Sequence, residues 1–71
     1  MHYSMVIQWD TPDNIYVVEV PELPGCMTHG ATYEEAVAQG LDAIDSWIAA
    51  AQDVGRPIPA PRTYVEDEVT A

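Results

Sequence analysis

The sequence contains very few basic residues, and this limits what the protein can bind. Of its 71 residues only two are Lys or Arg, namely Arg56 and Arg62, against 12 Asp and Glu, which gives a formal charge of −10. Proteins that bind nucleic acid contact its phosphates with clustered Lys and Arg. A chain without such a cluster should be repelled by nucleic acid and by anionic membranes. Two interpretations of the charge stay open: an acidic, soluble protein, or a protein steered by complementary charge to a basic partner.

Cysteine and long apolar runs are also scarce. The single cysteine, Cys26, cannot form a disulfide within the chain, and together with His2 and His29 it matches no zinc-site spacing. No apolar run reaches the length of a signal peptide or a membrane helix, so we expect a cytoplasmic protein without metal or cofactor. A chain this short buries little core, and oligomerisation, as a dimer or higher, is the remaining source of stability.

The first third of the chain has the alternating pattern of β-strands. Residues 2–9 place four apolar side chains on one face, and residues 15–20 form a second run after the turn-rich residues 10–14. Two such runs five residues apart predict a β-hairpin. A short edge strand is expected over residues 26–29.

One long helix is predicted after these strands. Thr32 and Glu35 form a capping box in which the glutamate reaches back to the Thr32 N–H, so the helix should run from Tyr33 to about Val54. An apolar stripe at steps of four and three is expected to face the sheet: Val37, Leu41, Ile44, Ile48 and Ala51. Three alternating prolines then require extended chain over residues 56–61. A short last strand is expected over residues 62–65 and a frayed acidic tail over residues 66–71.

These elements predict an α+β fold, a two-layer β-β-β-α-β sandwich in one domain over residues 1–71. One helix packs on one face of a small, mostly antiparallel sheet. The other face retains Val6, Ile15 and Val17. An exposed apolar patch of this kind marks an interaction site, so these three residues are the predicted oligomer interface.

No catalytic site and no metal site are predicted. Asp10, Asp13 and Glu19 could in principle hold Mg²⁺, but aspartates are common in hairpin turns for hydrogen-bonding reasons alone. Cys26 and His29 would make a nucleophile pair only if they faced each other, and residues three apart on a strand point to opposite faces.

Three spaced motifs resemble the HicB antitoxin family. They are a strand ending in Pro-x-x-Pro-Gly-Cys (residues 21–26), a helix entry Gly-x-Thr-x-x-Glu-Ala (residues 30–36), and an exit Pro-Ile-Pro-x-Pro (residues 57–61). The likeness extends from the first strand to about residue 65. It implies a partial RNase H-like fold and a non-enzymatic role in a type II toxin–antitoxin system.

The resemblance also implies a partner. Members of the family bind and block HicA, a small basic toxin that cleaves mRNA, and they form oligomers. Many carry a C-terminal DNA-binding domain as well, and because this sequence ends at Ala71 we expect no such domain in it. Direct nucleic-acid binding by the chain alone is therefore not expected.

The leading hypothesis is a HicB-like antitoxin that occludes the active site of a HicA-like toxin. Its partner-binding residues are expected on the acidic side of the helix, at Glu34, Glu35, Asp42 and Asp45. Two other hypotheses stay open. The chain could be an orphan oligomeric domain that binds another protein, or a metal-dependent nuclease that uses Asp10, Asp13 and Glu19.

Overall fold

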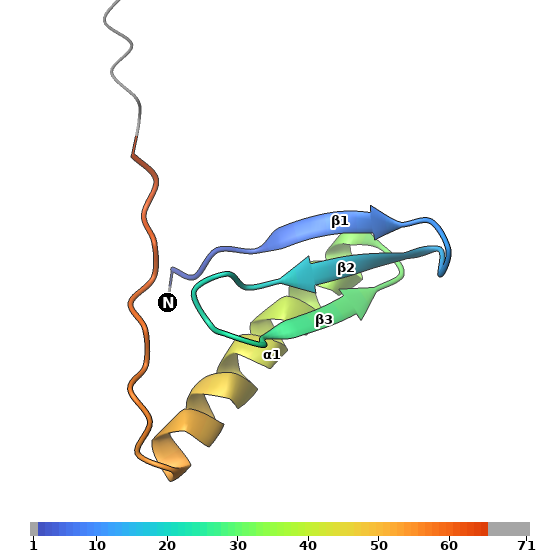
Figure 1. Ribbon diagram of the computed structural model, residues 1–71. Coiled ribbons are helices and arrows are strands. Elements are labelled where there is room, and N and C mark those ends of the chain that lie inside the picture. The colour runs from blue at the N-terminus through green and yellow to red at the C-terminus, as the bar shows by residue number, and fades with distance from the viewer. Residues whose placement is uncertain (1, 66–71) are drawn as a thin grey trace, which may run out of the picture.

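Three strands followed by one helix form the regular structure of the described part of the chain (Figure 1). The computed structural model describes residues 2–65. The strands form one antiparallel sheet in the order β1-β2-β3, and the helix packs on one face of it, which confirms the two-layer α+β arrangement. The bounds are β1, Val6–Asp10; β2, Ile15–Glu19; β3, Met27–Gly30; and α1, Tyr33–Asp53.

A tight turn joins β1 to β2 and confirms the predicted hairpin. Val6 lies opposite Glu19 at one end of the ladder, and Asp10 lies opposite Ile15 at the other. Asn14 adopts a left-handed conformation, with φ of 50°, and donates its N–H to the Thr11 carbonyl at 3.3 Å. Asparagine tolerates this region better than other residues with a side chain, so the sequence of the turn sets the register of the pair.

The loop from Val20 to Cys26 builds the core as it turns. Its backbone bonds to itself, with Val20 N donating to the Cys26 carbonyl at 3.0 Å and Leu23 N to the Val20 carbonyl at 3.1 Å. Gly25 takes the left-handed conformation that the turn needs, with φ of 78°. Because the loop satisfies its own backbone, it can bury Val20, Leu23 and Cys26 against Ile44 of α1.

The capping box at the start of α1 forms with one change of partner. Thr32 Oγ1 accepts from the Glu35 N–H at 3.1 Å, as expected. The Glu35 carboxylate, however, accepts from the N–H of Ala31 at 3.3 Å rather than from that of Thr32. At the other end Gly55 has φ of 67°, and Arg56 N donates to the Ala51 carbonyl at 2.8 Å, which closes the helix.

The buried face of α1 differs from the predicted stripe. Val37 and Leu41 were expected in the core, yet they are 42% and 57% exposed. A Cβ on Gly30 would lie 2.5 Å from the backbone N of Ala36, so helix and sheet touch there through small residues. That close approach turns the small side of the helix inward and leaves the two larger residues on its flank. The buried helix residues are Ala36, Gly40, Ile44 and Ala51.

The helix packs chiefly on β3 and β2 (Figure 1). The edge strand β1 lies on the far side of β2 and has little contact with the helix. Trp9 on β1 is therefore 50% exposed although it shares the helix-facing side of the sheet. Its ring meets Tyr16 edge-on at 5.0 Å between centroids, and Tyr16 stacks on Tyr33 of the helix at 4.4 Å. An aromatic row thus connects the edge strand to the start of α1.

After the helix the chain runs extended beside the N-terminal stretch (Figure 1). The extended conformation was predicted, but residues 62–65 form no strand. The Arg62 N–H donates to the Glu22 carboxylate at 2.9 Å instead of to a neighbouring strand. The Tyr3 hydroxyl donates to the Pro59 carbonyl at 2.6 Å and provides a second attachment. The predicted tail over residues 66–71 lies outside the described part of the chain.

Candidate protein-binding surface

The acidic residues singled out on the helix are all exposed, at Glu34, Glu35, Asp42 and Asp45. Glu34 and Glu35 occupy the first turn, where the helix dipole favours negative charge. The Glu35 carboxylate also caps the helix through Ala31, so it has a structural role. Because the chain has 12 acidic and only two basic residues, most of its carboxylates have no Lys or Arg within the chain with which to pair.

Apolar side chains follow the same helix on its exposed flank. Tyr33, Val37 and Leu41 are spaced four residues apart, so they lie above one another on consecutive turns, and we call them the flank strip. All three are exposed, Tyr33 by 63%. Rows of exposed apolar residues beside charged ones mark interaction surfaces. Val37 and Leu41 were predicted to lie in the core, and the small residues Ala36 and Gly40 were the signal against that placement.

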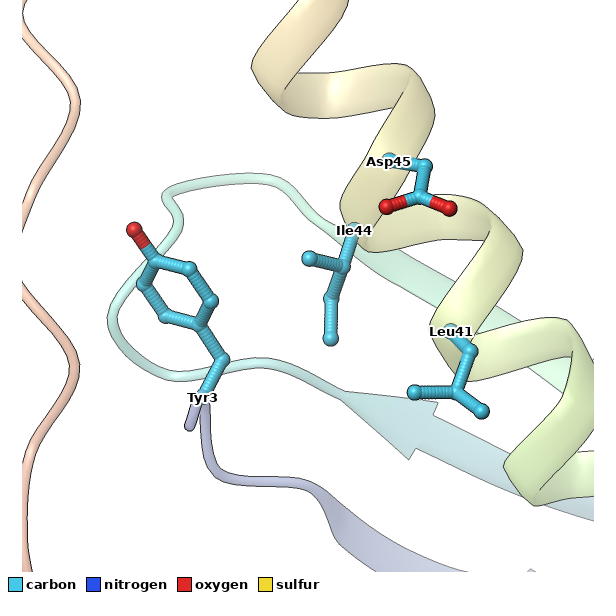
Figure 2. Close-up of a pocket in the computed structure, with 4 residues that line it drawn as sticks. All are labelled: Tyr3, Leu41, Ile44 and Asp45. Atoms are coloured by element: carbon cyan, nitrogen blue, oxygen red, sulfur yellow. The ribbon is translucent and has the colours of Figure 1, made fainter. Parts of the chain in front are cut away.

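A pocket lies at the end of the flank strip, between α1 and the N-terminal stretch (Figure 2). Its volume is about 290 Å³, and it is lined by Tyr3, Leu41, Ile44 and Asp45. Ile44 is only 4% exposed and belongs to the core, so the floor is apolar. The Tyr3 ring stands on one side and Leu41 and Asp45 on the other, which places a single carboxylate beside apolar walls.

A buried carboxylate holds the wall of this pocket in place. Glu22 is 7% exposed and accepts hydrogen bonds from the Ser4 N–H at 2.9 Å, the Ser4 hydroxyl at 3.0 Å and the Arg62 N–H at 2.9 Å. Burial alone would raise the pKa of Glu22, but the N–H groups of Arg62 and Ser4 lower it from 4.5 to about 2. Glu22 is therefore ionised at neutral pH, and it ties the stretch that carries Tyr3 to the segment after the helix.

The second predicted surface is the open face of the sheet. The register puts Val6, Val17 and Ile15 on the side opposite α1, together with Met27. Val6 is exposed, and Ile15 and Val17 are half-buried. The predicted placement of these side chains is thus confirmed, whereas their role as an oligomer interface stays a prediction. Met27, which is also exposed, was missed because its strand is short.

The residues considered for catalysis are not brought together. Asp10 and Glu19 lie at opposite ends of the β1–β2 ladder, roughly 13 Å apart by the rise of a strand. Within residues 2–65 no three His, Cys, Asp or Glu side chains are placed to hold a metal ion. Cys26 is buried, which raises the pKa of its thiol, whereas His29 is exposed on β3. These positions give no support for a nuclease centre or for a cysteine nucleophile.

A second, shallower pocket lies near the C-terminal end of α1, where Trp47 and Arg56 are among its lining residues. Trp47 donates its indole N–H to the Pro24 carbonyl at 2.9 Å, and the Arg56 guanidinium lies 5.5 Å from the centre of the Trp47 ring. This arrangement pins the last turns of α1 to the loop before β3. No helix of the described residues combines the length and the apolarity needed to cross a membrane.

The chain is similar to known proteins over most of its length. A family described as HicB-like antitoxin of bacterial toxin–antitoxin system matches residues 3–70. A UPF0150 protein of Thermoplasma acidophilum is 41% identical over 59 residues, 83% of this chain and 84% of the relative. UPF0150 proteins of Archaeoglobus fulgidus (35% identical; 76% of this chain, 77% of the relative) and Synechocystis sp. (32%; 84% and 81%) are also similar. No solved structure matches significantly.

Proposed function

Because this chain belongs to the HicB-like antitoxin family of bacterial toxin–antitoxin systems, we propose that it binds and neutralises a small basic HicA-type toxin that cleaves mRNA. The resemblance noted in the sequence motifs is confirmed by the family match. The proposal includes action in the cytoplasm, where such a toxin meets its mRNA, and no catalytic activity of the chain's own. The β-β-β-α order further supports a partial RNase H-like fold.

The observation that carries the proposal is the pairing of exposed acid with exposed apolar surface on one helix. Glu34, Asp42 and Asp45 point to solvent on the helix whose flank strip also remains uncovered. Protein interfaces combine an apolar centre with charged groups that select the partner. A net charge of −10 would speed the encounter with a basic protein and discourage contact with nucleic acid.

The mechanism of neutralisation is steric and electrostatic. An RNA-cleaving toxin binds its substrate through basic residues that contact phosphates. The carboxylates of α1 would form ion pairs with those same basic residues, so the antitoxin and the RNA would compete for one surface of the toxin. Glu35 contributes least in this scheme because its carboxylate already caps the helix.

Co-expression with a HicA-type protein from the same genome tests the proposal. We expect the two chains to co-purify and the complex to leave a reporter mRNA intact that the free toxin cleaves. A Glu34→Gln/Asp42→Asn/Asp45→Asn variant should bind at least about tenfold more weakly, because charge complementarity is lost at the interface.

A matched control separates local from general charge effects. An Asp13→Asn/Glu19→Gln/Asp53→Asn variant removes the same charge from exposed positions in the hairpin turn, on the open face of the sheet and at the helix end. It should lose no more than about twofold in affinity, the effect of long-range attraction alone. Equal losses of affinity in both variants would contradict the proposed binding surface. Absence of any complex would contradict the proposed function and favour an orphan domain with another protein partner.

We further propose that the chain forms a homo-oligomer, a dimer or higher, through the open face of the sheet. The exposed or half-buried side chains of Val6, Ile15 and Val17 support this, because a second copy would remove them from water. The helix would then stay free for the toxin.

A further inference from the structure

We propose that the pocket formed by Tyr3, Leu41, Ile44 and Asp45 receives one basic side chain, a lysine or an arginine, of the protein partner. The inference rests on the proposed function and makes it more specific: it names the place on the helix where a single residue of the toxin is anchored.

The lining of the pocket matches the two parts of a basic side chain. Lysine and arginine have an aliphatic stem and a charged head, and they bury the stem while the head finds a charge or water. The apolar floor at Ile44 and the wall at Leu41 suit the stem, and the carboxylate of Asp45 suits the head. The aromatic ring of Tyr3, which also lines the pocket, can make a second favourable contact to a cation.

Size and charge argue against other occupants. A volume of about 290 Å³ lies at the lower limit of small-molecule pockets, and it accommodates one long side chain. An acidic group would be repelled by Asp45. A purely apolar side chain would fill the floor but would leave that carboxylate partly desolvated and unpaired, which is costly.

The pocket is formed before any partner arrives. The Tyr3 hydroxyl is bound to the Pro59 carbonyl, and the next residue, Ser4, is bound through both its N–H and its hydroxyl to Glu22. These bonds fix the wall opposite the helix, so binding does not have to order it, and a preformed site keeps more of its interaction energy as affinity.

The pocket also continues the surface already assigned to the partner. Leu41 is at once the last residue of the flank strip and a wall of the pocket, and Asp45 lies one helical turn further on. A partner that covers the strip therefore reaches the pocket without leaving the helix.

Two aspartates of one helix provide a matched test. Asp45 lines the pocket and Asp42, which is also exposed, does not. In the complex with the HicA-type protein, Asp45→Asn should raise the dissociation rate about tenfold, because an anchored side chain loses its counter-charge. Asp42→Asn should change that rate by less than about twofold and act only on the association rate. Circular dichroism confirms that both variants fold.

A double-mutant cycle then identifies the anchored residue. Each Lys and Arg of the toxin is changed to Met, and the change in affinity is measured against both antitoxin variants. One toxin residue should couple to Asp45 by about fivefold or more and not to Asp42. If no toxin residue couples to Asp45, or if both aspartate variants dissociate alike, the pocket is not an anchor although the complex exists. If the wild-type chains form no complex, the proposed function and this inference both fall.

Discussion

Glu22→Gln is the change that tests most directly how the two ends of the chain are held. The Oε2 atom of Glu22 accepts from the Ser4 N–H, the Ser4 hydroxyl and the Arg62 N–H at 2.9 to 3.0 Å, and the Ser4 N–H also reaches Oε1 at 3.2 Å. The glutamine oxygen can take the place of Oε2, but its bonds are then to a neutral acceptor, and the NH₂ group in the place of Oε1 would face the Ser4 N–H, a donor. Each hydrogen bond to a charged group contributes about 1.5–3 kcal/mol, and these contributions are not additive.

We expect the Glu22→Gln change to lower the free energy of unfolding by roughly 2–3 kcal/mol, about the loss of one charged bond and the weakening of the others. In a domain of this size a loss of 1 kcal/mol lowers the melting temperature by about 4–8 °C, so the shift should be easy to measure. Urea and thermal unfolding followed by circular dichroism give both quantities. Glu19→Gln removes an exposed carboxylate of the same kind, and it should stay within about 0.5 kcal/mol of the wild type.

The pH dependence gives a second, independent check. The pKa of Glu22 is lowered from 4.5 to about 2, so its stabilising effect is complete above pH 4.5 and disappears as the pH falls toward 2. Other carboxylates titrate in both proteins and largely cancel in the difference. The gap in unfolding free energy between wild type and Glu22→Gln should therefore close over this range. A gap that is absent at pH 7, or that persists unchanged at pH 2, would refute the role assigned to Glu22.

Three further changes test the packing and the open face. Gly30→Ala places a Cβ 2.5 Å from the backbone N of Ala36 and should cost about 1–3 kcal/mol of unfolding free energy in urea titrations. Ile44→Ala should cost about 2–5 kcal/mol and Leu41→Ala less than about 1 kcal/mol, and equal costs would contradict the observed helix orientation. Val17→Glu should reduce the sedimenting mass to that of a monomer, whereas a wild type that is itself monomeric at micromolar concentration would remove the case for the open-face interface.

The strands and the helix could be predicted because each carries its signal locally. Alternation defines β1 and β2, asparagine with its neighbours defines the turn between them, and Thr32 marks the start of α1. The order of these elements then restricts the fold to one helix on one side of a small sheet. Even the outward placement of Val6 and Val17 follows, because the period of a strand is two.

The orientation of the helix could not be predicted from hydrophobicity. Val37 and Leu41 are the more apolar choice, and the protein buries Ala36 and Gly40 instead, because only small residues allow the backbone of α1 to approach β3 at Gly30. The pocket beside Leu41 could not be predicted either, because it exists only when Leu41 lies outside the core.

The burial of Glu22 could not be predicted from the sequence either. Its hydrogen-bond partners, Ser4 and Arg62, are 18 and 40 residues away in the sequence, and no local sequence pattern predicts contacts at that separation. The same bond explains why residues 62–65 did not form the expected strand, since the N–H of Arg62 is already used.

The attachment of Tyr3 to Pro59 joins residues 56 positions apart and closes nearly the whole chain into one loop. Closing a long loop is entropically costly, so we expect this link to form late in folding and to open in only a small fraction of molecules while the sheet and the helix remain intact. Hydrogen exchange should then show the segment after α1 to be less protected than the core. Because the Tyr3 ring is also a wall of the pocket, any molecule that binds there stabilises the closed chain, and closure in turn strengthens its binding. Occupancy of the pocket and resistance of the C-terminal segment to proteolysis should therefore rise together.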